Sequence, residues 1–555
     1  MIKLLKNETK CLIVQSEFSA FSYWNYSDVC NLVGAKYPAA PLGLLTVAAL
    51  LPQQWTFKLV DANVEDVLDE HFEWADIVCV GGMLPQQASM LSIINRAHQF
   101  DLPVVVGGPD PTSQPELYRT ADYLVLGEGE VTIPMFIADL AKGNTNGEYQ
   151  SEEKADMTKA VVPRFDLIRF QDYLQVGIQC SRGCPFHCEF CNIVELFGRN
   201  PRIKTPEQML RELQTLYNLG YRGHIDIVDD NFIGNKKNVK KVLTAIMEWS
   251  ESCKYPFYFS TECSINLADD ENLMQLMKDV DFRYVFVGIE TPEETALIQT
   301  NKTSNVNKPV TETIKKINSY GMIVNAGFII GFDEESDHIA ENMIRCIQDS
   351  GIAMAMLGLL YALPHTELSR RLTREGRLFE DSSTLKVDQT MIDQTTNGLN
   401  FLTNRPRIDI LRDYLCVESV IYNPKDYFSR VTRTALQLKW IPKFKPGFMK
   451  SLKTTIAFAK LSRQLLKNRA TAWSYVKMFT TVLFRNPRAI EAAVNLSAMF
   501  IHFHKQSKFI IKHIAHEIDV IESRQVEKSE FFIMDHYVPK NASANAYLEF
   551  EEVDR

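Results

Sequence analysis

Two successive series of short apolar runs, each run separated from the next by one amphipathic segment, constrain the fold most. In the first series the runs cover residues 10–16, 57–61, 76–82, 103–108 and 123–129. In the second series they begin at Tyr173, His224, Tyr255, Phe282, Met322 and Ala353. Strands that alternate with single helices form parallel sheets, because each connection crosses back over the sheet. The sequence therefore predicts an α/β protein with two parallel sheets.

The two series differ in what they can build. The first predicts a doubly wound sheet over residues 1–145, with ligands bound beyond the glycine-rich carboxyl ends of its strands. A polar, turn-rich stretch from Ala141 is expected to be a linker. Six units are too few for a closed eight-unit barrel, so residues 146–370 are expected to form a partial, open (βα)6 barrel. After about residue 370 only helix-like segments follow, which predicts a helical C-terminal domain over residues 371–555.

Composition narrows the class of protein. Hydrophobic residues make up 46% of the chain and charged residues 23%, as in soluble globular proteins, and the net charge of -9 argues against nucleic-acid binding. No signal peptide is visible, and the apolar runs are shorter than the roughly 20 residues that span a bilayer. We therefore expect a cytoplasmic location. In that reducing compartment the 11 cysteines are expected to be thiols or metal ligands.

The stretch "CSRGCPFHCEFCNI" places three cysteines in the pattern C-x3-C-x2-C, namely Cys184, Cys188 and Cys191. Three adjacent thiolates repel one another unless a metal centre takes up their charge. A four-iron cluster held by three cysteines leaves one iron free for another ligand. The alternative is a zinc site, for which His187 or Cys180 would have to supply the fourth ligand.

The motif, with Phe190 directly before its last cysteine, resembles that of the radical S-adenosylmethionine (SAM) enzymes. Starting the pattern at Cys180 instead fails, because its third position falls on His187. The resemblance implies a 4Fe-4S cluster whose free iron binds SAM and splits it to a 5'-deoxyadenosyl radical. It also implies a partial barrel with the motif after the first strand.

Further SAM-binding positions follow from the resemblance by matching strand ends. The second strand would supply contacts to the methionine amino group, the third a carboxylate for the ribose, and the fourth and fifth the surroundings of the adenine. The expected residues are Asp229, Asp230, Asn231, Glu262, Gly288, Glu290 and Gly327. The alternative for each is a helix N-cap or a salt bridge at the barrel rim.

A doubly wound domain directly before such a barrel resembles the cobalamin-binding arrangement of one subclass. The expected cobalamin contacts are Gly43, Met83, Gln86, Gly107, Gly108, Pro109, Gly127 and Glu128. The motif D-x-H-x-x-G, which supplies a histidine to cobalt in other cobalamin proteins, is absent. If cobalamin binds, we expect cobalt to lack a protein histidine. The alternative is a degenerate domain that binds nothing.

Four blocks narrow the resemblance to the cobalamin-dependent group that contains the hopanoid C-2 methyltransferase. They are "VGAKYPAAPLGLLTVAALLP", "GGMLPQQ", "RGCPFHCEFCNIVELFGRNPR" and "VDDNFIGNKK", within a match from about residue 20 to 420. The resemblance implies a methyltransferase acting on an unactivated carbon, and an electron donor of the flavodoxin or ferredoxin type. The alternatives are a non-methylating relative such as an anaerobic oxidative cyclase, and a non-catalytic iron-sulfur protein.

The C-terminal region contains a long stretch without acidic residues, between Asp426 and Glu491, in which arginines and lysines alternate with aromatic residues. Basic, aromatic helices suit anionic lipid headgroups. Peripheral association with the inner face of the membrane is one hypothesis, and it would suit a lipid substrate. The alternatives are a solvated basic face over an aromatic core and, less favoured, a nucleic-acid surface.

Overall fold

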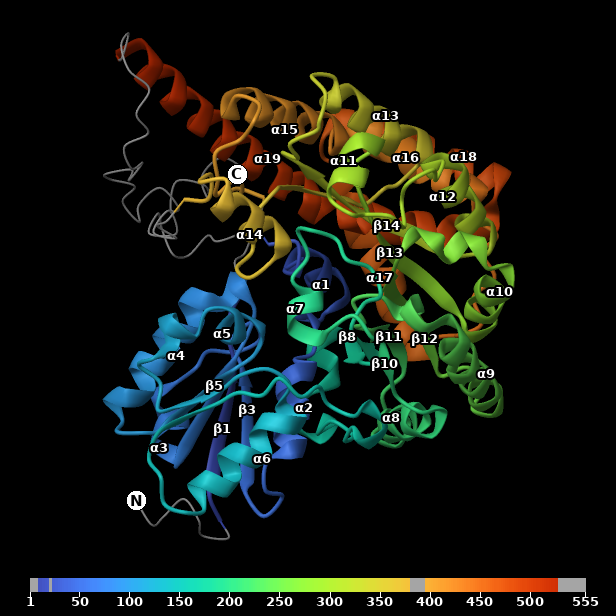
Figure 1. The fold of residues 1–555 in the computed structure, drawn as a ribbon. Coiled ribbons are helices and arrows are strands. Elements are labelled where there is room, and N and C mark those ends of the chain that lie inside the picture. Colours follow the sequence, from blue (N-terminus) through green and yellow to red (C-terminus); the bar gives the residue numbers. More distant parts are fainter. Residues whose placement is uncertain (1–7, 19–21, 380–394, 528–555) are drawn as a thin grey trace.

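A computed structural model describes residues 8–18, 22–379 and 395–527. Two parallel sheets and a set of C-terminal helices make up this part of the chain. In Figure 1 the first sheet, in blue, lies beside the second, in green to yellow, and the orange and red helices lie against the second. The predicted α/β class, with a doubly wound sheet, a partial barrel and a helical C-terminal region, is confirmed.

The first sheet contains six parallel strands in the order β3-β1-β4-β5-β6-β7. In chain order the strands are β1 (Lys10–Gln15), β3 (Thr56–Asp61), β4 (Ile77–Gly81), β5 (Val104–Gly107), β6 (Tyr123–Val125) and β7 (Gly147–Tyr149). The five strands predicted from apolar runs are all present. Strand β7 lies within the predicted polar linker and extends the first sheet past residue 145. The boundary between the first and second domains at residue 145 remains a prediction.

Successive residues of β1 pack on opposite faces of this sheet, as the alternation of side chains along a strand requires. Leu12 belongs to one buried cluster, with α3 (Asp69–Trp74) and α4 (Gln87–Gln99). Ile13 belongs to the other, with α2 (Leu42–Leu50) and α6 (Gly129–Leu140). Both faces are therefore covered by helices, which is the doubly wound arrangement.

The second sheet contains seven parallel strands in the order β15-β14-β13-β12-β11-β8-β2. They are β2 (Tyr37–Ala39), β8 (Tyr173–Ile178), β11 (Gly223–Ile227), β12 (Phe257–Cys263), β13 (Phe282–Glu290), β14 (Ile323–Ile330) and β15 (Ala355–Leu359). The six predicted strands are present, and β2 adds a seventh by pairing with β8. Its three residues include Pro38, and so short a run carries no periodicity that sequence analysis could detect.

Helices on the outside of the second sheet connect its strands. They are α8 (Pro206–Asn218), α9 (Lys236–Ser252), α10 (Glu271–Val280), α11 (Glu294–Gln299), α12 (Val310–Ser319) and α13 (Ile339–Ser350). The helix α8 starts at a capping box, in which the Thr205 hydroxyl and the Gln208 side chain each accept a bond from the other's backbone N–H. Thr205 is thus the N-cap of this helix.

The C-terminal helices share the large apolar core of the barrel. They are α15 (Arg407–Ile421), α16 (Pro424–Gln437), α17 (Phe448–Leu465), α18 (Arg469–Arg485) and α19 (Ile490–Glu527). Arg430 of α16 is fully buried and donates hydrogen bonds to the carbonyls of Ile352 and Ala353 beside β15. Among the helices of the described part of the chain, none combines the length and apolarity that crossing a bilayer requires.

Candidate functional site

The three motif cysteines lie on the loop that follows β8, the first of the predicted barrel strands. The loop begins as strand β9 (Ser181–Arg182), which pairs antiparallel with β10 (Arg202–Ile203), and continues into α7 (Ile193–Phe197). Gly183 has a φ of 92°, and a Cβ there would come within 2.9 Å of two carbonyl oxygens. Only glycine fits so close an approach of backbone to backbone.

The thiols of these cysteines lie close enough together to influence one another's ionisation. Burial, together with the charge on Cys184, raises the pKa of Cys188 to about 11 and that of Cys191 to about 12. The ammonium of Lys302 acts in the opposite direction on both. Such thiols stay protonated unless a metal centre takes up their charge, as in the predicted cluster.

The donor set suits a cubane iron-sulfur cluster, which binds each of three thiolates at a different iron. Within the described ranges, no three His, Cys, Asp or Glu side chains converge on a site for one metal ion. Cys180, one of the two possible fourth ligands of a zinc site, is completely buried. The other, His187, has a buried Nδ1 without a hydrogen-bond partner among the described residues.

Asp229, at the end of β11, fixes the start of the cysteine loop. Its carboxylate accepts hydrogen bonds from the backbone N–H groups of Cys180 and Ser181, both at 2.7 Å, and from the Ser181 hydroxyl at 2.6 Å. Burial raises the pKa of Asp229 to about 7 in spite of these bonds. Its predicted contact with the methionine amino group remains a prediction, since both oxygens already accept bonds from the loop.

Asn231 connects the loop to the next strand. Its amide nitrogen donates to the Sγ of Cys184 at 3.7 Å, and its amide oxygen accepts from the backbone N–H of Ser264, just after β12, at 3.2 Å. A hydrogen bond to a ligating sulfur tunes the potential of an iron-sulfur cluster. The arrangement suits a residue that orients the first cysteine.

Asp230 follows the end of β11, and Glu262 lies on β12 near its end, so both are at the same edge of the barrel. Burial raises the pKa of Asp230 to about 6. Burial, together with the charges of Asp226, Asp230 and Asp229, raises that of Glu262 to about 8. In the described part of the chain, neither side chain forms an ion pair or a side-chain hydrogen bond. Once ionised, carboxylates that lack an ion-pair partner favour a cationic ligand, and SAM carries a sulfonium and an ammonium group.

Gly288 and Gly327 are paired in register on β13 and β14. Glu290, displaced by a bulge after Gly288, has a φ of 66° and is 2.5 Å from the ammonium of Lys302. A Cβ on Gly288 would lie 2.3 Å from the Glu290 carboxylate. Burial disfavours the charged form of Lys302, but the attraction of Glu290 and Cys188 outweighs it and raises its pKa.

Lys302 was missed by sequence analysis, because it lies on the loop after α11 and belongs to no motif. Its ammonium is 5.9 Å from the ring centre of Phe190, and Phe190 packs on Phe332 at 5.6 Å. The lysine therefore places a positive charge beside the cysteine loop.

A second missed feature is an ion-pair network that holds the loop from its far side. Glu189 pairs with Arg371 of α14 (Glu367–Arg374), and Arg371 also pairs with Asp333 at 2.8 Å. The backbone of Glu189 bonds to the Thr300 carbonyl and to the Leu368 N–H, each at 2.9 Å. Nothing local in the sequence signals these contacts, since Glu189 and Arg371 lie 182 residues apart and Arg371 and Asp333 lie 38 residues apart.

The residues predicted to contact cobalamin lie at the carboxyl edge of the first sheet. Gly108 (φ 107°) and Gly127 (φ 84°) follow β5 and β6, and Pro109 begins α5 (Pro109–Ser113). A Cβ on Gly43 would meet no atom within 4 Å, and one on Gly127 only a carbonyl oxygen at 3.9 Å. These backbones border open space, which suits the approach of a flat ring.

The other predicted cobalamin contacts differ in whether the residue is exposed or already packed against the protein. Met83 is 37% exposed and free to meet a ligand. Gln86 is buried, and its amide donates to the Ser16 carbonyl at 2.6 Å. A Cβ on Gly107 would lie 2.7 Å from the Val125 carbonyl, so this glycine serves the close approach of β5 and β6.

Glu128 connects the two sheets. It pairs with Arg202 at 2.7 Å and with Arg182 at 3.0 Å, and Arg182 also pairs with Glu130 at 2.7 Å. Arg182 and Arg202 belong to the ribbon that carries the cysteine loop. Glu128 therefore joins the edge of the first sheet to that loop, which brings the two predicted cofactor regions together.

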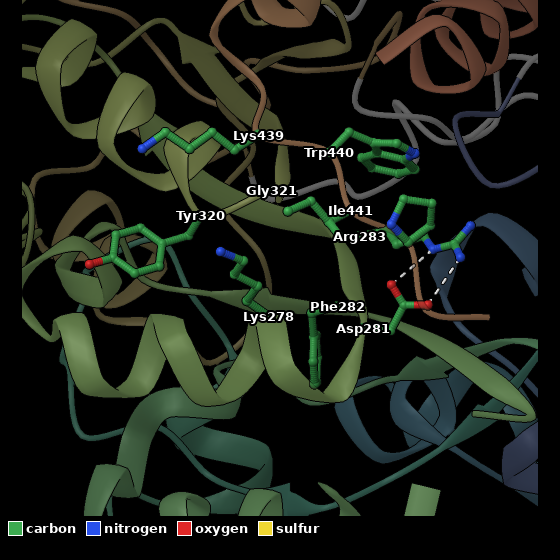
Figure 2. A pocket seen from close by; sticks show the side chains of 10 residues that line it. Lys278, Asp281, Phe282, Arg283, Tyr320, Gly321, Lys439, Trp440 and Ile441 are labelled. Carbon is green, nitrogen blue, oxygen red and sulfur yellow. Dashed lines mark hydrogen bonds and ion pairs between the residues drawn. The ribbon is translucent and has the colours of Figure 1, made fainter. Parts of the chain in front are cut away.

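The pocket drawn in Figure 2 lies elsewhere. Its lining includes Asp281, Phe282 and Arg283 at the amino end of β13, together with Trp440 and Ile441. The cysteine loop follows the carboxyl end of a parallel strand. The pocket is thus at the opposite end of the barrel and takes no part in the candidate site.

Comparison with known proteins matches the same segments. The Radical SAM superfamily profile matches residues 178–347, the B12 binding domain profile residues 29–137, and a domain of unknown function (DUF4070) residues 366–516. The uncharacterized methyltransferase sll1242 of Synechocystis sp. is 40% identical over 513 residues, covering 92% of this chain and 94% of its own.

The chain belongs to the cobalamin-dependent radical SAM methyltransferase family. The hopanoid C-2 methylase of Rhodopseudomonas palustris is also 40% identical, over 62% of this chain and 66% of its own. Among solved structures, the cobalamin-dependent SAM radical enzyme OxsB superposes with a TM-score of 0.56 at 14% identity, covering 95% of this chain and 82% of its own. This likeness supports the fold.

Membership of this family confirms the predicted enzyme class and cofactors. This methyltransferase uses a 4Fe-4S cluster, SAM and cobalamin, and it needs a small-molecule substrate and an electron donor. The alternatives of a zinc site and of a non-catalytic iron-sulfur protein are not supported. The individual ligand and contact residues remain predictions, which the geometry above makes specific.

Proposed function

We propose that this enzyme transfers a methyl group to an unactivated carbon of a hopanoid-like polycyclic lipid. The observation that supports the radical chemistry is the meeting, at one barrel edge, of three interacting thiols and two carboxylates without ion-pair partners. Similarity to the hopanoid C-2 methylase supports the choice of substrate class.

The roles of the chain's own residues follow from the geometry. Cys184, Cys188 and Cys191 hold the cluster, Asn231 orients Cys184, and Lys302 adds a positive charge. Other residues surround SAM at the strand ends, namely Asp230, Glu262, Gly288 and Gly327. The bound cofactors supply hydrogen abstraction by a radical and a methyl group. The protein binds and orients the cofactors and the substrate, and it excludes water. The proposed reaction requires no general base.

The cobalamin contacts are proposed at the carboxyl edge of the first sheet, at the open positions Gly43, Met83 and Gly127 and at the neighbouring Gly108 and Pro109. The two histidines of this domain, His71 and His98, have other partners. His71 lies in α3, where its Nδ1 accepts from the Leu68 N–H, and His98 in α4 is 3.1 Å from Asp122. We therefore propose that cobalt receives no histidine from this domain.

Two partners belong to the same proposal. An electron donor of the flavodoxin or ferredoxin type would reduce the cluster. A polycyclic lipid partitions into bilayers, so the proposal includes peripheral association with the inner face of a membrane.

An anaerobic oxidative cyclase reaction is the second candidate. The anaerobic magnesium-protoporphyrin IX monomethyl ester cyclase of Rubrivivax gelatinosus is 21% identical over 309 residues. Its cofactors would be the same, so the mass of the product separates the two. Gain of one methyl group supports the methyltransferase, and ring closure or oxygen insertion supports the cyclase.

The test is anaerobic reconstitution with iron, sulfide and cobalamin, followed by mass spectrometry of lipids from an expressing host. We expect lipids heavier by one methyl group. Cys188→Ala should abolish the modification, whereas the matched variant Cys416→Ala, at an exposed cysteine remote from the loop in sequence, should retain it. Unmodified lipids from reconstituted, iron-loaded enzyme would refute the lipid substrate.

A further inference from the structure

We propose that the outward faces of α17 and α18 form a docking face for an anionic lipid bilayer. Large apolar side chains lie exposed on both helices of this hairpin. We define the docking face by Phe448, Met449, Leu452, Ile456, Trp473, Val476, Leu483 and Phe484. Phe448, Trp473 and Phe484 are 81%, 73% and 83% exposed, far more than such residues are in a folded core.

The exposed residues follow the period of a helix. Phe448, Leu452 and Ile456 are four residues apart, so they form one stripe along α17. Trp473, Val476 and Phe484 fall on one side of α18 by the same rule. The apolar surface is therefore organised into continuous stripes, which mark an interaction site more strongly than isolated exposed residues do.

Charge identifies the chemistry of the partner. Residues 427–490 contain no aspartate or glutamate. Exposed cations flank the apolar stripes, namely Lys453, Lys460, Lys477 and Arg485. Basic residues beside Trp, Phe and Leu are the composition of helices that lie in the interface of anionic membranes.

The structure also shows which residues of this basic segment do not belong to the docking face. Arg430, Trp440, Phe444 and Tyr475 are buried in the protein. The aromatic core expected as the alternative to a membrane surface therefore exists, but it accounts for other residues. Arg430 lies in α16, Trp440 and Phe444 lie between α16 and α17, and only Tyr475 belongs to the hairpin, whereas the docking face lies on the exposed sides of α17 and α18.

The hairpin is a folded unit that presents this face to the outside. The rings of Phe458 and Phe479 stack at 5.8 Å between the helices, and the hydroxyls of Ser462 and Tyr475 are hydrogen-bonded at 2.9 Å. Leu461 and Met478 are buried beneath. The apolar stripes therefore lie on well-packed, folded helices.

The hairpin is also attached firmly to the barrel. Asp281, drawn with its partner Arg283 in Figure 2, accepts hydrogen bonds from the backbone N–H groups of Lys443 and Phe444 at 3.1 and 2.8 Å. Lys450, in the first turn of α17, donates to the carbonyl of Arg222 at 3.1 Å. Docking would therefore bring the catalytic barrel to the membrane surface.

A bilayer explains the face better than other partners do. A second copy of the chain would bring like charges together at this face. A nucleic acid would leave the aliphatic side chains Leu452, Ile456 and Leu483 exposed. The choice of a lipid bilayer rests in part on the proposed lipid substrate, although docking can be measured without turnover.

Flotation of the full chain with vesicles tests the proposal. We expect the protein to float with vesicles containing anionic phosphatidylglycerol and to remain at the bottom with phosphatidylcholine alone. The variant Lys453→Glu/Lys460→Glu/Lys477→Glu should lower the partition coefficient at least about 100-fold, since each cation near an anionic surface contributes about a fivefold factor. The variant Phe448→Ser/Trp473→Ser/Phe484→Ser should also lose binding.

Matched variants elsewhere on the surface provide the controls. Lys237→Glu/Lys241→Glu/Lys315→Glu makes the same charge change at exposed lysines of α9 and α12, and Met135→Ser/Leu219→Ser/Ile298→Ser removes exposed apolar residues. Both should float like the wild type. Circular dichroism verifies that every variant is folded.

Several results would overturn the docking face. They are no flotation of the wild type, equal loss in the control variants, or wild-type flotation of the two docking-face variants. Loss of a dimer in sedimentation when Trp473 is replaced would assign the face to self-association, and tight RNA binding would assign it to nucleic acid. A docking-face variant that fails to float but still methylates detergent-dispersed lipid would support both claims. Its failure to float would support the docking face, and its activity would support the proposed function.

Discussion

Replacing Glu262 by glutamine should remove a pH dependence from SAM binding. The pKa of Glu262 is raised from 4.5 to about 8, by burial and by the charges of Asp226, Asp230 and Asp229. The ionised carboxylate attracts cationic SAM, and bound SAM lowers the pKa in return. Affinity should therefore rise with pH until Glu262 is ionised.

The size of the effect follows from the fraction ionised. Below its pKa, ionised Glu262 decreases about tenfold for each unit of pH, so SAM affinity should fall about tenfold per unit. Glu262 is half ionised at pH 8 and about 1% ionised at pH 6, so the expected loss of affinity between these pH values is about 50-fold, equivalent to about 2.3 kcal/mol. Asp230, with a pKa of about 6, adds its own decrease below that pH.

Equilibrium binding of SAM to the anaerobic, cluster-loaded enzyme across pH 6 to about 8.5 measures this dependence. Glu262→Gln is the matched control, because titration of SAM itself affects both proteins equally and cancels in their ratio. The ratio of wild-type to variant affinity should increase with pH. A ratio that stays constant would refute the placement of Glu262 beside SAM.

Three further results are expected. Lys302→Met should make the midpoint potential of the cluster more negative by tens of millivolts, because a positive charge stabilises the reduced cluster. Lys308→Met, which removes a surface ion pair with Asp269, should leave the potential unchanged. Arg182→Gln should destabilise the protein in urea by about 3 kcal/mol, because it removes a partner of the buried Glu128, and the double variant with Glu130→Gln should be less than additive. Burial raises the pKa of Glu418 to about 7, so its stabilising contribution to the apoprotein is present below pH 4.5 and is lost as pH rises through 7. Glu418→Gln should therefore raise the free energy of unfolding at pH 8 by about 3 kcal/mol. An unchanged free energy of unfolding would contradict a buried charge at Glu418.

The fold was predictable where a strand is long enough to show its pattern. Runs such as "DIVCVGG" combine branched apolar residues with a terminal glycine, so β4 and its neighbours could be placed from the sequence. Strands β2 and β7 have three residues each, and their pairing with β8 and β6 depends on contacts across the chain. Tertiary pairing of this kind leaves no local signal.

The site was predictable to the same extent. The cysteines are close in sequence, so their spacing alone indicates a shared centre. Lys302 and the Glu189–Arg371 pair reach the loop from distant segments, so only folding brings them there. Asp229 was predicted at the correct edge, but its hydrogen bonds to the loop backbone follow from the geometry of two neighbouring strands.

The central claim is that three cysteines anchor a cluster whose free iron binds SAM. Electron paramagnetic resonance of the dithionite-reduced, anaerobically reconstituted protein tests it most directly. We expect the signal of a reduced 4Fe-4S cluster that changes when SAM is added and is lost in Cys184→Ala, Cys188→Ala and Cys191→Ala, but retained in Cys416→Ala. A spectrum that is insensitive to SAM, or a protein that contains zinc in place of iron, would contradict the account.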